Sequence, residues 1–319
     1  MKTEKNLSLA RVLTVILTFA LMLALASCGN SGNAGNESAA NDETGAADTD
    51  AENAAAQDAE EIESDADEVE NSANGTEPDA ESDLAYVQAK GNLIVGITEF
   101  EPMDYQDEAG NWIGFDADMA RAFAESLGVE PVFQIVDWDN KVFELEGQTI
   151  DVVWNGMTLT EEVLNSMECS RAYFNNSQVV VVPATSSAAY ANPEATVEDL
   201  SAAVFAVESG SAGKEQADEN NFNYTEVADQ ATALLEVASG TADAAIVDYL
   251  MAKAMTGEGS SYANLTDTVA LNSEEYGVGF RKGSDLAEAL NNFFHDAYQD
   301  GTMQTVAETY GIADALIEQ

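Results

Sequence analysis

Short apolar runs alternate with amphipathic stretches over residues 84–319. The runs are four to five residues long and rich in Val, Ile and Ala, which is typical of buried strands. Strands are expected at residues 93–97, 132–136, 150–154, 179–182, 203–207, 244–247 and 276–280. Apolar positions at helical spacing predict helices at residues 115–127, from 212 onward, and at 232–239, 285–299 and 302–310. This alternation indicates an α/β fold with largely parallel or mixed sheets.

The N-terminal segment has the pattern of a secretory signal peptide. Lys2, Lys5 and Arg11 precede an apolar run over residues 12–26, which is short for a membrane span. The run ends in Leu-Ala-Ser-Cys28, which resembles the lipobox of bacterial lipoproteins. The resemblance implies cleavage after residue 27 and a diacylglycerol on Cys28, an anchor of two acyl chains that binds membranes stably. Ordinary secretion with a chance cysteine is the alternative.

An acidic segment follows, over residues 28–83. It consists largely of Ala, Asn, Asp, Glu, Gly and Ser, and no Lys or Arg occurs between Arg11 and Lys90. Such a composition predicts a disordered tether, because it buries too little apolar surface to offset the entropy of ordering. A calcium-binding tract is the competing interpretation. The formal net charge of −48 argues against nucleic acid as a partner.

Residues 84–319 are numerous enough for two modest lobes. With Cys28 lipidated, Cys169 has no partner, so no internal disulfide is expected. One histidine, His295, and one free cysteine give no metal-ligand spacing, and neither a metal nor a cofactor is expected.

Several motifs lie at the turns where strands end, which is where ligands bind in open α/β sheets. Their order along the chain resembles that of the polar-amino-acid family of ABC-transporter solute-binding proteins, with the periplasmic binding protein type II fold. The motifs are LIVGITEFEPMDY (93–105), GFDAD (114–118), DWD (137–139), ID through NGMTLT (150–160), AVESGS (206–211), ADAAIVD (242–248) and YGVGF (276–280).

The resemblance implies a domain organisation. Lobe 1 would comprise residues 84–182 plus 275–319, and lobe 2 residues 183–274. Two crossovers, near Val182 and Tyr276, would form a hinge on which the lobes close over a ligand. The protein would be a monomer that serves an ABC permease and ATPase from the outer side of the cell membrane, to which its lipid anchors it.

The resemblance also implies the ligand site. Phe100 and Trp138 would form aromatic walls. Contacts to a ligand carboxylate would come from the turn Asn155, Gly156 and Thr158. The remaining candidates are Ser211 at a helix N-terminus, which favours an anion, Asp248 for the ligand ammonium, and Glu99 for the same end or for a cationic side chain. Phe100 and Trp138 as core residues, and Ser211 as a helix cap only, remain open.

One position departs from the family pattern. Val163 stands where the family has an arginine that holds the ligand carboxylate with two bonds. Arg171 is the next basic residue, but its surroundings do not match that role. The remaining acids favour a ligand that is a net cation or a zwitterion; they are Glu99, Asp137, Asp139 and Asp248. An amino acid is therefore the expected ligand, with a basic amino acid or a polyamine-like cation as alternatives.

Three other functions remain open beside transport. Some dehydratases and the N-terminal parts of some lytic transglycosylases share the implied fold, although we expect binding and not catalysis. A receptor module for signalling is a second alternative, and a surface adhesin or structural lipoprotein is a third.

Overall fold

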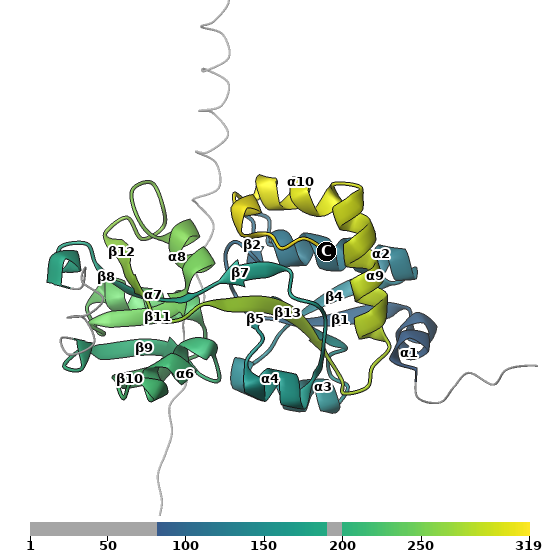
Figure 1. Ribbon diagram of the computed structural model, residues 1–319, viewed down its shortest axis with the longest axis horizontal. Helices are drawn as coiled ribbons and strands as arrows, with labels where there is room; N and C mark the ends of the chain where they lie inside the picture. The colour runs from purple at the N-terminus through teal and green to yellow at the C-terminus, as the bar shows by residue number, and fades with distance from the viewer. Residues whose placement is uncertain (1–81, 190–199) are drawn as a thin grey trace, which may run out of the picture. The chain divides into compact units, whose positions relative to one another are not determined.

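The computed structural model describes residues 82–189 and 200–319 (Figure 1). The expected signal peptide, Cys28 and the acidic segment as far as residue 81 lie outside the described residues. The described part contains two large sheets and a small hairpin formed by β2 (Tyr105–Gln106) and β3 (Trp112–Ile113).

The first sheet is mixed. Its order is β4 (Glu130–Ile135), β1 (Asn92–Ile97), β5 (Val152–Thr158), β13 (Glu274–Phe280) and β6 (Glu168–Cys169), and β7 (Phe174–Asn176) also pairs with β13. Strand β1 is parallel to β4 and β5, whereas β13 is antiparallel to β5, β6 and β7. We call this sheet and its helices lobe 1.

Helices cover both faces of the first sheet because β5 is apolar on both. Val152 and Trp154 pack into one core, and Val153 and Met157 pack into another. Figure 1 shows α2 (Phe115–Leu127), α9 (Leu286–Gln299) and α10 (Thr302–Thr309) on one side, and α3 (Lys141–Glu146) and α4 (Glu161–Ser166) on the other. Helix α1 (Asp83–Lys90) contacts α9 and β1.

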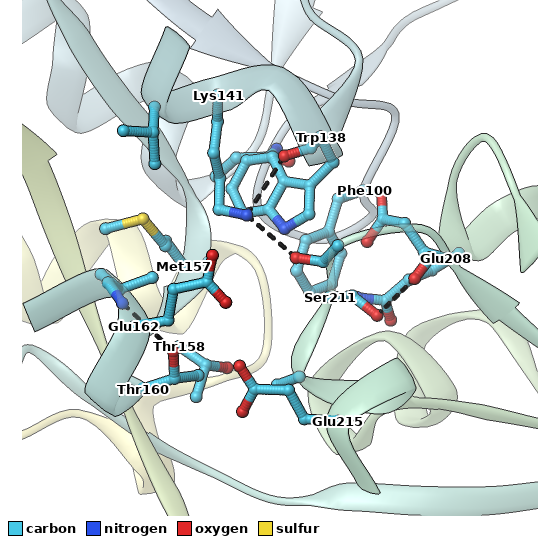
Figure 2. A pocket seen from close by; sticks show the side chains of 17 residues that line it. Phe100, Trp138, Lys141, Met157, Thr158, Thr160, Glu162, Glu208, Ser211 and Glu215 are labelled. Atoms are coloured by element: carbon cyan, nitrogen blue, oxygen red, sulfur yellow. Dashed lines mark hydrogen bonds between the residues drawn. The ribbon is translucent and has the colours of Figure 1, made fainter. Parts of the chain in front are cut away.

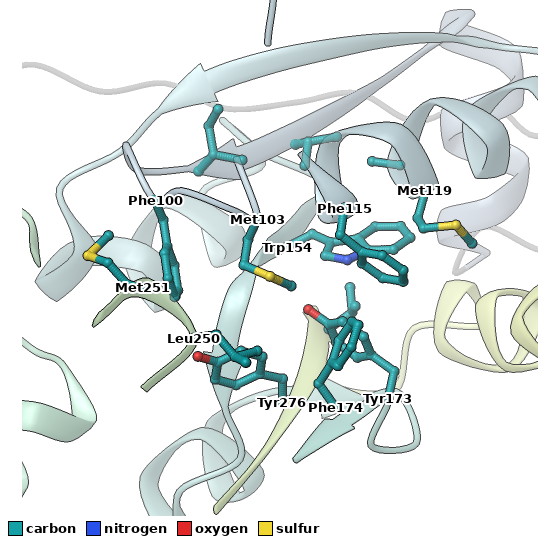
Figure 3. Close-up of a cluster of buried hydrophobic side chains, with 14 of the residues drawn as sticks. Phe100, Met103, Phe115, Met119, Trp154, Tyr173, Phe174, Leu250, Met251 and Tyr276 are labelled. Carbon is teal, nitrogen blue, oxygen red and sulfur yellow. The ribbon is translucent and has the colours of Figure 1, made fainter. Parts of the chain in front are cut away.

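Aromatic side chains dominate the larger core. Phe115 of α2 stacks on Tyr173 and meets Phe174 edge to face at a centroid distance of 4.7 Å. Figure 3 shows Trp154 and Tyr276 in the same cluster, with Met103 between Phe100 and Trp154. This packing holds the C-terminal ends of β1 and β5 in place.

The second sheet has the order β10 (Asn223–Val227), β9 (Val204–Glu208), β11 (Ala244–Asp248), β8 (Gln178–Pro183) and β12 (Leu265–Ala270). Strand β9 is parallel to β10 and β11, and β8 is antiparallel to β11 and β12. Helices α6 (Ala212–Glu219), α7 (Gln230–Ser239) and α8 (Tyr249–Met255) pack on it. This sheet and its helices form lobe 2.

The chain passes between the sheets twice. It leaves the first sheet after β7 and enters the second at β8, so the change falls at Ser177 and not near Val182 as expected from the resemblance. It returns between β12 and β13. The two crossovers are neighbours, because β7 pairs with β13 from Glu274 to Tyr276 and Leu271 N–H donates to Gln178 O.

The mixed α/β architecture with two sheets is confirmed. The helix expected over residues 115–127 has those bounds, and the left-handed Gly128 ends it. The strand expected over 150–154 runs instead from Val152 to Thr158, and the side chain of Asp151, directly before it, accepts from Lys90 Nζ and from Ile94 N–H.

Candidate functional site

A cavity lies between the two lobes, at the C-terminal ends of β1, β5 and β9. The space free of protein atoms in and around it is about 540 Å³, which includes open solvent at its mouth. Lobe 1 contributes Phe100, Trp138, Lys141, Val142, Asn155, Gly156, Met157, Thr158, Thr160, Glu162 and Val163, and lobe 2 contributes Glu208, Gly210, Ser211, Ala212, Glu215 and Gln230. Figure 2 shows the labelled side chains of both groups facing a common space.

The two predicted aromatic residues line this cavity. Phe100 follows β1 and packs edge to face on Tyr276, with its ring against Gly156, where an added Cβ would lie 2.6 Å from Phe100 Cε1. Trp138 begins the 3-10 turn η1 (Trp138–Asn140). Both side chains are buried. They are therefore core residues on one side and cavity walls on the other.

The predicted turn at the end of β5 also lines the cavity, but its polar groups hold the protein together. Asn155 Oδ1 accepts from Thr98 N–H and from Thr98 Oγ1. Gly156 N–H donates to a carboxylate oxygen of Asp116 at 2.6 Å. Thr158 Oγ1 donates to Glu274 at 2.9 Å. These bonds fix the shape of the cavity floor.

Ser211 caps helix α6 at the cavity. Its Oγ accepts from Lys214 N–H at 3.2 Å and donates to Glu208 O at 2.8 Å. The hydroxyl is therefore used in the cap. The first-turn N–H groups of α6 that Ser211 does not cap remain the feature of this helix end that attracts an anion.

Asp248 and Glu99 do not line the cavity. Asp248 is buried beside it, where it accepts from Gln178 Nε2 at 3.0 Å and from the Tyr276 hydroxyl at 2.7 Å, and it also accepts from Gln230, a lining residue. Burial, and second the nearby Glu274, raise the pKa of Asp248 to about 8. Glu99 lies in a neighbouring hollow with other acids and accepts from Gln106 N–H.

The cavity carries four charged side chains that the sequence motifs did not single out. Lys141 and Glu208 are buried at 8% and 3% exposure, and Glu162 and Glu215 are exposed at the rim. Burial lowers the pKa of Lys141, although the surrounding carboxylates oppose this shift. Burial, followed by repulsion from Asp248, holds the pKa of Glu208 well above its usual range. The Oε1 atom of Glu208 is buried without a hydrogen bond.

These charges had weak signals in the sequence. Lys141 lies one helical turn after Trp138, and Glu208 lies within the AVESGS motif beside Ser211. Only the fold shows that they face one cavity. Val163 lines the same cavity, whereas Arg171 is exposed and does not.

Membrane-spanning helices and metal-ligand clusters are both absent from the described residues. Within residues 82–189 and 200–319, no helix has the length and apolar character needed to cross a membrane. The same residues contain no group of three or more His, Cys, Asp and Glu side chains placed to hold a metal ion.

The two-lobed architecture and its interlobe cavity can be compared with known proteins. Residues 93–313 match the profile of the bacterial extracellular solute-binding proteins, family 3. The chain belongs to this family. The solute-binding family assigned from the motifs is thereby confirmed, and with it an extracytoplasmic place of action.

Individual relatives of this solute-binding chain have known ligands or activities. L-cystine-binding protein TcyJ of Escherichia coli is 28% identical over 235 residues, covering 72% of this chain and 86% of its own. A mutant form of ArgBP from T. maritima superposes with a TM-score of 0.66 at 30% identity, covering 72% of this chain and 99% of its own. Arginine-bound ArgBP is also known. A cyclohexadienyl dehydratase of Pseudomonas aeruginosa is 34% identical over 83 residues, which cover 26% of this chain and 31% of the dehydratase.

Proposed function

We propose that this chain captures an amino acid with a cationic group in the interlobe cavity and delivers it to an ABC permease and ATPase. The observation that carries the proposal is the charge of the cavity. Glu162, Glu208 and Glu215 face it together with Lys141. With Glu208 ionised, the formal charge of this set is −2, which favours a ligand that carries one or more cationic groups.

Glu208 is the proposed partner of the ligand's cationic group. Its carboxylate is buried and one oxygen has no hydrogen bond, which is costly unless a ligand supplies a donor. The faces of Phe100 and Trp138 would hold the same group by cation–π contact. Asp248 would orient Gln230 for the ligand, because Gln230 donates to it from the cavity wall. The carboxylate of Glu99, in the adjoining hollow, would attract the cationic group of an approaching ligand.

The names of two relatives support an amino acid as the ligand. The names of TcyJ and the arginine-bound ArgBP describe proteins that bind cystine and arginine. Cystine has an ammonium group at each end, and arginine has a cationic side chain. A polyamine is the second candidate, favoured by the three glutamates. We propose binding without turnover, so incubation with prephenate or arogenate should leave these compounds unchanged, and their conversion would contradict the proposal.

A thermal-shift series tests the proposed ligand class. Purified protein is unfolded and refolded to remove any carried-over ligand, and then mixed singly with the twenty amino acids, cystine, ornithine and polyamines. A ligand at 100 times its dissociation constant stabilises the folded state by about 2.7 kcal/mol, which raises the midpoint by several degrees. Shifts with basic amino acids or cystine are expected. Shifts with polyamines alone would replace the proposed ligand class, and no shift at all would refute it.

Asp248→Asn provides the site control for that series. We expect it to weaken the shift, because it removes a carboxyl oxygen that accepts from Gln230 and so holds this lining side chain in place. Asp243→Asn is the matched variant in the same segment, since Asp243 is exposed and accepts a hydrogen bond from Val204 N–H away from the cavity. An equal shift in both variants would argue against a role for Asp248.

The lipid anchor belongs to the same proposal. Cys28 follows a signal-peptide pattern and a small-residue cleavage site, and a monomer tethered by its lipid and an acidic segment would present the lobes to the permease. Cys28→Ser should move the protein from the membrane fraction to the medium or periplasm and abolish incorporation of labelled fatty acid. Retention of the label would contradict the assignment.

A further inference from the structure

Among the described residues that line the cavity, Lys141 is the one cationic side chain. It begins helix α3, and its ammonium lies 4.9 Å from the centre of the Trp138 ring. Nζ donates to Trp138 O at 3.1 Å and to Gly210 O at 2.9 Å. Figure 2 shows these two bonds on the cavity side of the side chain. An ammonium has three donors, so a third is available to a ligand.

Four carboxylates lie near Lys141 and favour its charged form, namely those of Glu208, Glu162, Asp139 and Glu215. Both of its hydrogen bonds are to uncharged backbone carbonyls, and none of the ion pairs among the described residues includes it. Burying an ammonium without an ion pair is unfavourable. An anionic group of a ligand that accepts from the remaining donor would give this ammonium the direct ion pair that the carboxylates around it do not form.

The position of Lys141 also couples the two lobes. Trp138 belongs to lobe 1 and Gly210 to lobe 2, so Nζ bonds to both only while the lobes are closed. The lobes touch at this point, because a Cβ added to Gly210 would lie 2.6 Å from Asp139 Cα. An anion bound to Lys141 would therefore add to the two hydrogen bonds by which Lys141 stabilises the closed state.

We propose that Lys141 binds the carboxylate of the ligand and so makes the site select amino acids over the corresponding amines. The proposal rests on the proposed function, because it assumes that an amino acid occupies the cavity. It assigns the carboxylate to a helix of lobe 1 other than α4, where Val163 offers only an apolar side chain to the same cavity. Glu208 and the rim glutamates remain available for the cationic groups.

Matched acid and amine pairs test this assignment. The probes are L-arginine and agmatine, L-lysine and cadaverine, L-histidine and histamine, and L-cystine and cystamine, each measured by calorimetry on the refolded protein. In the wild type, every acid that binds should bind more tightly than its amine. Lys141→Met keeps the length of the side chain and removes the charge. It should weaken binding of the acid by about 10-fold to 100-fold and change the amine much less, so that the preference disappears.

Two further variants separate charge from packing. Lys141→Arg should keep the preference for the acid. Lys253→Met is the control, since Lys253 is exposed on α8 and lies over the Tyr249 ring as Lys141 lies over Trp138, away from the cavity. It should behave as the wild type. Thermal midpoints without ligand show whether each variant is folded.

The outcomes distinguish the two proposals. The first outcome is that acids bind and that Lys141→Met either weakens acid and amine equally or changes neither affinity. Lys141 then has a structural role, and this inference is wrong while the proposed function stands. If none of the four acids binds to the wild type, both are refuted.

Discussion

Glu208 and Lys141 are the two charged side chains buried in the described wall of the cavity, and burial disfavours the charged form of each. Glu208 Oε1 has no hydrogen bond, and Lys141 has only carbonyl partners. The same desolvation that destabilises them in the empty cavity strengthens their attraction for a charged ligand. Binding strength at this site is therefore linked to a loss of stability in the free protein.

The pH dependence of stability should reveal Glu208. Its pKa is raised from the ordinary 4.5, so the folded state binds the proton more tightly than the unfolded chain. Its contribution favours folding below about pH 4.5 and is lost as the pH rises through the folded-state value. Glu208→Gln should raise the thermal midpoint of the ligand-free protein at pH 8 by a few degrees. The midpoint of this variant should also fall less steeply than that of the wild type as the pH rises. Some decline should remain, because burial also raises the pKa of Asp248 to about 8.

Thermal denaturation between pH 4.5 and pH 8.5 checks this prediction, with Glu258→Gln as the control at an exposed turn. The same Glu208→Gln protein should bind basic amino acids more weakly. A steeper pH dependence than that of the wild type would show that the carboxylate is stabilising in the folded state.

Ser211 caps helix α6 and also helps to hold the cavity wall in shape. Ser211 Oγ accepts from Lys214 N–H and donates to Glu208 O, so one hydroxyl joins the start of α6 to the end of β9. Helix α1 begins in the same way, since Ser82 Oγ accepts from Ala85 N–H and donates to Asp285. The two caps differ in one respect, because only Ser211 lies at the cavity.

Ser211→Ala and Ser82→Ala form a matched pair of cap variants. Each should destabilise the protein by about 1 kcal/mol through loss of an N-cap, which corresponds to about 2 to 4 °C for a protein of this size. Only Ser211→Ala should also weaken ligand binding, because the turn that carries Glu208 and the first N–H groups of α6 loses its support. Equal affinities in the two variants, by calorimetry, would show that the α6 terminus has no part in the site.

At the scale of the whole molecule, function depends on how closely the lobes approach. Gly210 has φ +68° and packs against the backbone of Asp139 in the opposite lobe. The β7 and β13 crossovers are paired in the hinge region of the molecule, where Asn176 donates to both Asp248 and Glu274. Closure of the lobes therefore depends both on close packing at Gly210 and on the polar contacts of the two crossovers.

Gly210→Ala should impair closure. A Cβ there would lie 2.6 Å from Asp139 Cα, and the left-handed backbone costs any L-residue about 1 to 2 kcal/mol. Gly257→Ala isolates the second effect, because Gly257 has φ +89° and open space around it. Both variants should lose stability, but only Gly210→Ala should lose affinity, by about 10-fold or more. Small-angle scattering should show that it stays open with ligand, and normal compaction would contradict the prediction.

The sequence by itself determined those features that depend on local pattern. Apolar spacing located α2 and most strands, and the order of the motifs assigned Phe100, Trp138, Gly156, Thr158 and Ser211 to one ligand site. All five line the cavity. Helical and strand periodicities are properties of neighbouring residues, so one chain suffices to show them.

Tertiary structure alone decided which groups are available to a ligand. The run Val179–Val182 is equally apolar in either sheet, and only pairing with β11 and β12 assigns β8 to lobe 2. Asn155 was expected to face a ligand, yet its side chain is bonded to Thr98. Lys141 and Glu208 come from opposite lobes, and burial gives them their perturbed pKa values. Such properties follow from contacts between distant segments and from exclusion of water, which a linear pattern does not record.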